Sequence, residues 1–391
     1  MSKLYELIQE LCPDGVPFVK LEELCPVMRG KRLTKSQLSD DGQYVVYHGS
    51  KDTPLGFYDD YNVEGDTVIV VNTGGIGGVK YIKDNFWCSD GSFWIKYNDK
   101  INNKFLYYYL VQYEGYYLSQ KRVGGVPTID KSVVSNTRIP VPPLEVQCEI
   151  VRILDKFTLL TAELTAELTA ELTARRKQYE YYRNLLVSFN NVIQKRKFGN
   201  IASIQRGASP RPISQFITND MEGVNWIKIG DVDKESKYIT KSKEKITIDG
   251  SKKSRKVKKG DFILSNSMSF GRPYILAIDG CIHDGWLSIS DFEDVFISDF
   301  LYYLLNSNDI QNEFRKKASF GGAVQNLNAD IVRGIELHIP SKDKQQKIIN
   351  ILDRFDKLCN DITFGLPAEI ELNNKRYEYY RDKLLTFKEK K

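Results

Sequence analysis

Residues 177–189 read KQYEYYRNLLVSF, and residues 375–387 read KRYEYYRDKLLTF. Subtracting 177 from 375 gives an offset of 198 between these two blocks. A second pair, VPPLEVQCEIVRILDKF at 141–157 and IPSKDKQQKIINILDRF at 339–355, has the same offset. Two separate blocks with one offset indicate that the chain contains one unit twice, and such internal repetition is a direct sequence signature of architecture.

The stretches between these blocks are also related, although more weakly. Four matches share their order along the chain: Val19–Gly30 with Arg196–Gly207, Gly65–Asp66 with Gly260–Asp261, Asp90–Gly91 with Asp284–Gly285, and Phe105–Tyr108 with Phe300–Tyr303. The offset is 177 for the first match, 194 or 195 for the other three and 198 for the two blocks above, so the second copy contains about 21 extra residues (198 minus 177). Some of these lie in the lysine-rich stretch 231–259.

Residues 143–189 predict one long helix. They contain no glycine, and no proline after Pro143, which stands where a helix start tolerates proline. Apolar residues follow the i, i+3, i+4, i+7 spacing of an amphipathic helix at Ile150, Ile153, Leu154 and Phe157. At ~1.5 Å per residue the helix would be ~70 Å long, which exceeds an ordinary domain helix. Its copy at about 342–388 contains Gly365 and Pro367, which should break or kink it.

Residues 161–172 are three tandem copies of Thr-Ala-Glu-Leu. Ala, Glu and Leu are strong helix formers, so each unit should extend the helix by ~6 Å. A four-residue period advances ~40° beyond one turn, so the leucines should drift around the axis instead of forming a heptad seam. The array is either a plain solvated linker or a spacer between the two copies. The spacer interpretation is favoured because Phe157–Tyr179 and Phe355–Tyr377 are both separated by 22 residues.

The remaining regions, about 15–140 and 195–338, predict α+β globular domains. Short β runs are expected at 67–71, 93–97, 262–265 and 274–278, and one helix in each domain, near 105–118 and 300–316. We therefore divide the chain into a first globular domain at 1–142, a central long helix at 143–189, a second globular domain at 190–340 and a C-terminal long helix at 341–391. The two helices should pack as an antiparallel coiled coil with pseudo-twofold symmetry.

Composition limits the function classes. A chain of 391 residues with 41% apolar and 27% charged residues is long enough for two or three globular domains and is not disordered. Its net charge of +5 is only mildly basic, so any nucleic-acid role depends on local patches. The six cysteines form no C-x-x-C pair and the three histidines lie far apart, which gives no zinc site. Without a leader or a run of ~18 apolar residues, the protein is expected to be cytoplasmic.

Sequence motifs for catalysis are absent. The chain has no G-x-x-x-x-G-K-[ST], no H-E-x-x-H, no G-x-S-x-G, and no Asn/Asp-Pro-Pro-aromatic tetrapeptide of an adenine methyltransferase. The glycine-rich stretch 73–78 lacks the Lys-Ser/Thr pair of a phosphate-binding loop. It reads as a tight turn after a strand, although its amides could approach a phosphate.

Basic residues beside glycine recur at the same place in both copies. A charge run is commonly a solvated face, but this repetition suits contact with nucleic-acid phosphates. Asn72 and Asn266 follow matching strands, and such amides either read adenine edges or cap turns. The candidate DNA contacts are Arg29, Lys31, Arg32, Asn72, Lys80, Arg206, Arg211, Lys252, Lys253, Arg255, Lys256, Asn266 and Arg272.

The two Tyr-Glu-Tyr-Tyr-Arg blocks suggest a division of helix faces. Two stripes have helical spacing: Tyr179, Tyr182, Leu186 and Phe189, and Tyr377, Tyr380, Leu384 and Phe387. Each stripe is expected to pack on the other helix. That would leave Tyr181, Arg183, Tyr379 and Arg381 outside for a partner protein, because Tyr and Arg are common interface anchors. The alternative is that all these tyrosines are intramolecular core.

Duplicated globular domains that alternate with duplicated long helices, with a Thr-Ala-Glu-Leu array before Tyr-Glu-Tyr-Tyr-Arg, resemble the specificity (S) subunit of a type I restriction-modification system, of the IC-like branch. The resemblance covers the whole chain. It implies that each globular copy is a target recognition domain that reads half of a bipartite double-stranded DNA site. It also implies that the helices separate these domains and dock two methyltransferase (M) subunits, that restriction/translocase (R) subunits join them, and that the array sets the length of unread DNA.

The same resemblance implies a non-catalytic subunit without its own cofactor, in the cytoplasm of a bacterium or archaeon that defends itself against phage. S-adenosylmethionine, ATP and Mg²⁺ would belong to the partner subunits. One departure from symmetry is Gly365-Leu366-Pro367, which occupies the place of the array in the second helix. Two alternatives stay open: a DNA methyltransferase with built-in recognition domains, and a coiled-coil scaffold that carries two modules for something other than DNA.

Overall fold

The chain folds into two units, each with its own hydrophobic core. The computed structural model describes residues 3–122, 125–189, 193–232, 236–266, 270–318, 327–361 and 365–390. Unit 1 comprises Met1–Glu167 with Glu371–Lys391, and unit 2 comprises Leu168–Ile370. Each unit therefore combines one globular domain with the start of the long helix that follows it and the end of the other one. The predicted start of the second globular domain at residue 190 lies outside the described residues.

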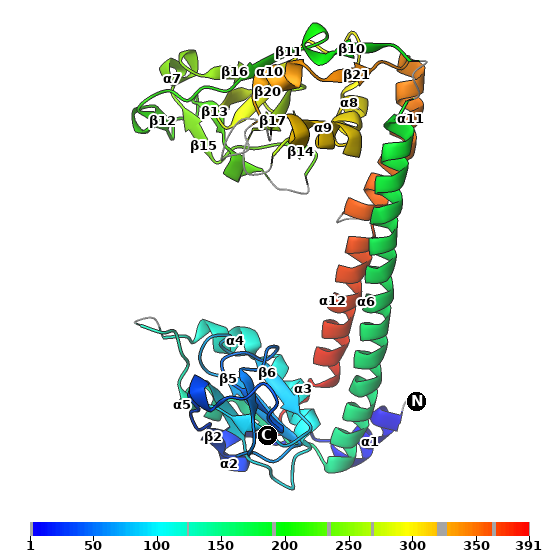
Figure 1. Ribbon diagram of the computed structural model, residues 1–391. Helices are drawn as coiled ribbons and strands as arrows, with labels where there is room; N and C mark the ends of the chain where they lie inside the picture. Colours follow the sequence, from blue (N-terminus) through cyan, green and yellow to red (C-terminus); the bar gives the residue numbers. More distant parts are fainter. Residues whose placement is uncertain are drawn as a thin grey trace. The chain divides into compact units, whose positions relative to one another are not determined.

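Unit 1 contains a four-stranded and a three-stranded sheet (Figure 1). The four-stranded sheet has the order β2-β8-β5-β6, from Val27–Arg29, Ser92–Ile95, Thr67–Val71 and Val79–Ile82. The three-stranded sheet has the order β4-β3-β7, from Gly56–Tyr58, Tyr44–Tyr47 and Trp87–Cys88. Strand β1 (Phe18–Lys20) pairs with β9 (Arg138–Pro140). The helices are α1 (Lys3–Leu11), α2 (Leu21–Leu24), α3 (Asn103–Val111), α4 (Glu114–Ser119) and α5 (Lys131–Ser135).

Unit 2 repeats this plan and extends it. Its first sheet has the order β11-β20-β17-β18-β14, from Ser203–Arg206, Trp286–Ser290, Phe262–Ser265, Pro273–Leu276 and Tyr238–Ile239. The second has the order β12-β15-β13-β19-β16, from Ile217–Thr218, Glu244–Ile246, Val224–Ile227, Gly280–Ile282 and Arg255–Val257. Strand β10 (Lys195–Lys197) pairs with β21 (Glu336–His338). The helices are α7 (Ile248–Lys252), α8 (Ser298–Leu305), α9 (Asn308–Ala318) and α10 (Ala329–Arg333).

The extra residues of the second copy build sheet edges. Strands β11, β20, β17 and β18 follow the order of β2, β8, β5 and β6, and β14 is added beside β18 from the stretch 231–259. The predicted β runs at 67–71, 93–97, 262–265 and 274–278 coincide with β5, β8, β17 and β18 within two residues. The prediction of one helix near 105–118 and one near 300–316 is wrong, because each region forms two helices, α3 with α4 and α8 with α9. The α+β fold class with two globular domains and long helices is confirmed.

The long helices also agree with the sequence. Helix α6 spans Leu144–Val187 without interruption, whereas its copy divides into α11 (Lys342–Asn360) and α12 (Leu366–Leu384). Pro367 stands in the first turn of α12, where its missing N–H removes no helical hydrogen bond. The predicted break at Gly365 and Pro367 is confirmed.

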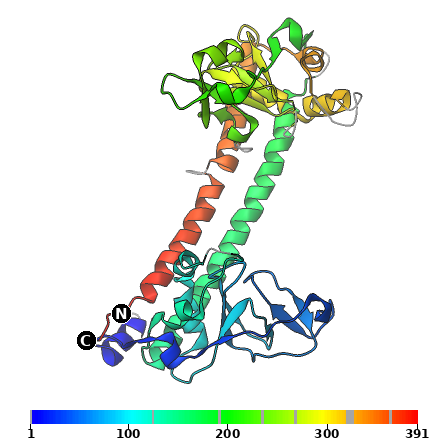
Figure 2. The same ribbon diagram turned by 90° about the vertical axis from the view of Figure 1, so that its left-hand side faces the viewer.

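In unit 1, α12 runs antiparallel to the first half of α6, and the two lie side by side in both views (Figure 1 and Figure 2). The Tyr377 hydroxyl lies 2.9 Å from that of Thr158, and the Asn373 amide donates to Thr165 at 2.9 Å. Within the array, Leu164 is 42% exposed while Leu168 and Leu172 are half-buried. The leucines therefore drift around the helix, as a four-residue period predicts.

An equivalent pair of stacked rings joins the two long helices within each unit. Phe157 stacks on Tyr380 in unit 1 with ring centroids 6.1 Å apart, and Phe355 stacks on Tyr182 in unit 2 at 5.6 Å. The last residues of each stripe pack on the globular domains, because Phe387 meets Phe105 and Phe189 meets Phe300. The expectation that the whole stripe packs on the other helix is therefore wrong for its final turn.

The C-terminal tail completes the first globular domain. Val16 donates to the Lys388 carbonyl and accepts from the Lys390 amide, both at 2.9 Å. In the second unit, Ile339 donates to the Gln194 carbonyl at 3.0 Å, next to the start of β10. The equivalent bond in unit 1 runs from the Val141 amide to the Pro17 carbonyl, also at 3.0 Å, so the C-terminal tail is a further contact beside β1.

Candidate functional site

The arginine-glycine end of one strand meets an aspartate-glycine turn in both units. Strand β2 ends at Arg29, and a Cβ added to Gly30 would lie 2.1 Å from the Ser89 carbonyl oxygen. Strand β11 ends at Arg206, and a Cβ added to Gly207 would lie 2.0 Å from the His283 carbonyl oxygen. Only glycine permits so close an approach of two backbones. We call these two places the strand-turn platforms.

A histidine holds the turn of each platform. The Gly91 amide donates to Nδ1 of His48 at 3.1 Å, and the Gly285 amide donates to Nδ1 of His283 at 2.6 Å. Burial lowers the pKa of His283, which favours the neutral ring that can accept this bond. Neither histidine was predicted as a site residue. His48 follows strand β3 and lies 43 residues from Gly91, and a single histidine before a turn, such as His283, carries no distinctive sequence signal.

The two asparagines lie behind these turns. Asn72 donates from its side-chain amide to the Asp90 carbonyl at 3.1 Å, and Asn266 donates to the Asp284 carbonyl at 2.8 Å. They are 1% and 4% exposed. A buried amide that is bonded to backbone presents no free edge to a base, so this geometry favours the turn-capping alternative over base reading.

Three arginines gather around the turn in unit 2. Arg206 donates from Nε to the Asp284 carbonyl at 3.1 Å, and a guanidinium nitrogen of Arg211 lies 3.8 Å from the Asp284 carboxylate. Arg255 donates from Nε to the carbonyl of Arg206 at 3.2 Å. The Ser209 hydroxyl, bonded at 2.8 Å, lowers the pKa of Asp284. The structure therefore brings together three candidates that are up to 49 residues apart in sequence.

The corresponding cations of unit 1 are exposed. Arg29, Lys31 and Arg32 all lie at the surface around the end of β2. The backbone of Lys31 is held on both sides, because its amide donates to the Cys88 carbonyl and its carbonyl accepts from Nε1 of Trp87. A fixed backbone with exposed cationic side chains suits phosphate contact.

The glycine-rich stretch 73–78 is a tight turn between β5 and β6. Gly74 and Gly77 have φ of +83° and +84°, which favours glycine. The Glu114 carboxylate accepts from the Val79 amide at 2.8 Å and pairs with Lys51 at 2.7 Å. Lys80 donates to the Lys51 carbonyl at 2.8 Å. The side chain of the candidate Lys80 is therefore held by a hydrogen bond to the backbone beside the turn.

The lysine-rich run at 252–259 divides between the end of α7 and strand β16. Lys252 pairs with Asp249 at 2.8 Å, and the Lys253 ammonium lies 4.8 Å from the Phe216 ring centroid. Lys256, Lys258 and Lys259 are exposed.

Neutralising this run should weaken binding to every DNA sequence alike. We expect Gln in place of Lys252, Lys253, Arg255, Lys256, Lys258 and Lys259 to reduce the slope of log K against log[salt] by ~0.9 for each phosphate that the protein no longer neutralises. Equilibrium binding at several salt concentrations measures the slope, and Lys375→Gln on α12 is the control. An unchanged slope would show that the run is a solvated face.

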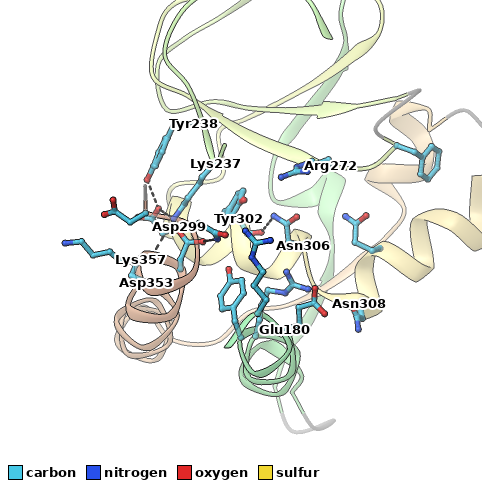
Figure 3. Close-up of a pocket in the computed structure, with 18 of the residues that line it drawn as sticks. Glu180, Lys237, Tyr238, Arg272, Asp299, Tyr302, Asn306, Asn308, Asp353 and Lys357 are labelled. Atoms are coloured by element: carbon cyan, nitrogen blue, oxygen red, sulfur yellow. Dashed lines mark hydrogen bonds and ion pairs between the residues drawn. The ribbon is translucent and has the colours of Figure 1, made fainter. Parts of the chain in front are cut away.

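A polar pocket of about 1050 Å³ lies within unit 2 (Figure 3). Residues from α6, α8, α9 and α11 line it, together with Lys237 and Tyr238 at β14. Figure 3 shows Lys237, Asp299 and Asp353 on one side of the pocket. Candidate Arg272 also lines it, with its guanidinium 5.7 Å from the Tyr274 ring centroid. The structure thus places Arg272 apart from the arginines around the Asp284 turn.

The predicted partner contacts divide by residue type. Tyr181 and Tyr379 are 63% and 60% exposed, as expected for an outer face. The Arg381 side chain is 12% exposed and pairs with Asp382, and the Arg183 guanidinium lies 5.7 Å from the Tyr179 ring centroid. Within the described part of the chain, Nε of Arg183 is buried without a hydrogen-bond partner. The arginines are therefore partly inside the fold and the tyrosines outside it.

Neither a metal site nor a membrane span emerges from the part of the chain that the structure describes. It holds no group of three His, Cys, Asp or Glu side chains suited to a metal ion. None of its helices has the length and apolar character to cross a membrane.

Two equivalent platforms, each mounted on paired helices, define a binding protein with two recognition modules. The family model described as type I restriction modification DNA specificity domain matches residues 13–174 and 191–372. The chain therefore belongs to the family of type I restriction-modification specificity subunits, the DNA-specificity components of these complexes and not their catalytic ones. This membership supports the specificity subunit over both alternatives, the methyltransferase and the scaffold for other ligands.

Curated relatives and solved structures agree with this membership. The chain is 31% identical over 392 residues to a type I restriction enzyme specificity subunit of Haemophilus influenzae, which covers 95% of this chain and 96% of the relative. It is 32% identical over 271 residues to the EcoR124I/EcoR124II specificity subunit of Escherichia coli, covering 65% of this chain and 64% of the relative.

The fold is similar to that of two solved chains. One, from a study of complex assembly and conformational transition of the type I restriction-modification system, has a TM-score of 0.69 and 16% identity, and the match covers 95% of this chain and 98% of that one. The HsdS subunit of Thermoanaerobacter tengcongensis has a TM-score of 0.55 and 17% identity, and the match covers 96% and 97%.

Proposed function

We propose that each globular domain reads one half of a bipartite double-stranded DNA site, with its strand-turn platform against the DNA. The observation that carries this proposal is the recurrence of the same platform in both units, with an arginine at the strand end and a glycine where the turn approaches. Two equivalent readers in one chain suit a site made of two separate halves.

At each platform, some side chains would contact phosphates and others would contact bases. Arg29, Lys31 and Arg32 in unit 1, and Arg206, Arg211 and Arg255 in unit 2, would contact phosphates, since guanidinium and ammonium groups position a protein on the duplex. Side chains beside the turns would then reach base edges. Two further candidates, Lys80 and Arg272, are held by the fold, so we assign them supporting roles.

The long helices would bind the catalytic subunits. We assign two M subunits to the helices, with R subunits joining that assembly, because Tyr181 and Tyr379 present equivalent exposed rings in the two units. S-adenosylmethionine, ATP and Mg²⁺ would be held by those partners, and this chain would carry no cofactor of its own. The complex would act in the cytoplasm of a bacterium or archaeon.

The test is to express the chain with the M subunits of its own system and to map methylated adenines in the host genome. Paired methylated adenines at one fixed bipartite sequence support the proposal. The M subunits without this chain are the control and should leave no such pattern. Methylation at a continuous site, or activity of the purified chain alone with S-adenosylmethionine, contradicts it.

Replacing the exposed tyrosines should weaken assembly and leave the fold intact. We expect Tyr181→Ala or Tyr379→Ala to weaken binding of one M subunit by about tenfold, because a large exposed ring contributes on the order of 1–2 kcal/mol at an interface. Titration calorimetry measures the affinity, and Leu118→Ala, which is also exposed but lies on α4 and not on a long helix, is the control. A fall in melting temperature with unchanged affinity would place these rings in the intramolecular core.

A further inference from the structure

In each unit, an aspartate on a long helix accepts a hydrogen bond from a tyrosine of the globular domain and pairs with a lysine of that domain. Asp155 on α6 and Asp353 on α11 stand at the offset of 198 that relates the two copies. We infer that Lys237 is a positioning residue, which fixes the orientation of the second recognition domain on α11 and thereby the register in which that domain meets its DNA half-site. This inference rests on the proposed function.

The simpler arrangement occurs in unit 1. Lys104 and Tyr108 lie one helical turn apart on α3, so they share one face of that helix. The Lys104 ammonium lies 2.7 Å from the Asp155 carboxylate, and the Tyr108 hydroxyl donates to the same carboxylate at 2.8 Å. Both contacts join α3 to α6, and the Lys104 ammonium also lies 5.6 Å from the ring centroid of Tyr81 on β6.

In unit 2 the equivalent tyrosine is present, but the lysine comes from a different part of the domain. The Tyr303 hydroxyl donates to Asp353, as Tyr108 does to Asp155. At the place of Lys104, one residue before the repeated Phe-Leu-Tyr-Tyr, this copy has Asp299. The charge at this position is therefore reversed. An acidic residue here would face Asp353 without compensation unless a cation came from elsewhere.

Lys237 supplies that cation from the edge of the sheet. Its ammonium lies 2.6 Å from Asp299 and 3.8 Å from Asp353 (Figure 3). It also lies 4.7 Å from the ring centroid of Tyr303 and 5.1 Å from that of Tyr302. Only 12% of the side chain is exposed, against 38% for Lys104. A cation held by two carboxylates and aromatic faces is strongly confined.

The position of Lys237 beside strand β14 links the sheet to the helices that its side chain contacts. Lys237 directly precedes β14, the strand that the extra residues of the second copy add to the sheet, and its carbonyl accepts from the Ile275 amide at 3.0 Å. The lysine therefore joins three parts of unit 2: the sheet, helix α8 and helix α11. A rotation of the domain on α11 would separate Lys237 from Asp353, which couples the cation to domain orientation.

The test compares three variants of the full chain, assembled with M subunits, with wild type. Lys237→Met removes the cation, and the double variant Lys237→Met/Asp299→Lys places a lysine where unit 1 has Lys104. Lys357→Met, an exposed lysine that lines the same pocket, is the matched control. Genome-wide mapping of methylated adenines gives the gap between half-sites, and thermal unfolding reports stability.

We expect Lys237→Met to raise the share of sites methylated at a gap one base pair too long or too short by about tenfold, the scale of one coupled contact network. The half-site sequences should stay the same, and the double variant should restore most of the fidelity. A lower melting temperature with an unchanged gap distribution, or failure of the double variant to restore the distribution, would overturn the inference. Wild type without paired methylation would instead overturn the proposed function.

Discussion

Removing one Thr-Ala-Glu-Leu unit should shorten the unread DNA between the two half-sites by one base pair. Deleting Thr169–Leu172 removes ~6 Å of helix and rotates the remainder of the helix by ~40°. Duplex DNA turns by about 34° and rises ~3.4 Å per base pair, so the rotation matches one base pair while the length is nearer two. Angular phase should decide, because a reader on the wrong side of a groove makes no base contacts, whereas DNA bending absorbs a small axial mismatch.

The array makes this experiment unusually clean. Its three units are identical, so deleting any one of them gives the same sequence and keeps Leu160 before the array and Thr173 after it. Helix α6 runs through the array without a break, so the deletion shortens a continuous helix. Methylated-adenine mapping for the three-unit and two-unit chains gives both gaps.

A variant of unchanged length separates the effect of spacing from that of composition. Glu163→Ala with Glu167→Ala replaces two exposed residues of the array and should leave the gap as it is. A changed half-site sequence after the deletion, or an unchanged gap with retained methylation, would mean that the array is only a linker.

Alanine at either platform glycine should strongly weaken recognition of one half-site. The added methyl group of Gly207→Ala would lie 2.0 Å from the His283 carbonyl oxygen, and that of Gly30→Ala 2.1 Å from the Ser89 carbonyl oxygen. Both neighbours are backbone, so the strand and the turn must separate, at a cost of about 1–3 kcal/mol. We expect affinity for the corresponding half-site to fall about ten- to hundredfold.

The two variants should differ in which half-site they lose. Binding to duplexes that keep one half-site and scramble the other measures each effect separately. Gly115→Ala in unit 1 and Gly230→Ala in unit 2 are matched controls, because an added Cβ at either position meets no atom within 4 Å. Full affinity of Gly207→Ala for both half-sites would show that the turn lies away from the DNA.

The two globular copies differ more in their sheets than in the contacts that join them to the long helices. Gln147 and Gln345 make the same bonds in both units, from the side-chain amide to the carbonyls of Pro142 and Pro340 at 2.7 and 2.9 Å. Such contacts join a helix start to its domain and depend on few residues. The sheets differ at their edges, where the second copy has the additional strand β14 beside β18.

Sequence alone was sufficient for the features that depend on local chain order. The offset of 198 gave the duplication, and the apolar spacing from Ile150 to Phe157 gave α6. Gly365 and Pro367 gave the break between α11 and α12, because proline and glycine act on the backbone at their own positions. The β runs at 67–71 and 262–265 were equally local, since a buried strand is a short apolar run.

Only the tertiary structure decided which side chains meet. Asn72 and Asn266 followed the right strands, but their burial behind the turns depends on carbonyls 18 residues further along the chain. Arg183 and Arg381 stand four residues after Tyr179 and Tyr377, so helical spacing already places them over those rings and away from the face of Tyr181 and Tyr379, but their burial depends on packing against the other elements. Lys237 showed no signal at all, since its carboxylate partners lie 62 and 116 residues away. Periodicity fixes the face of an element, whereas ion pairs and turn contacts depend on how separate elements are brought together.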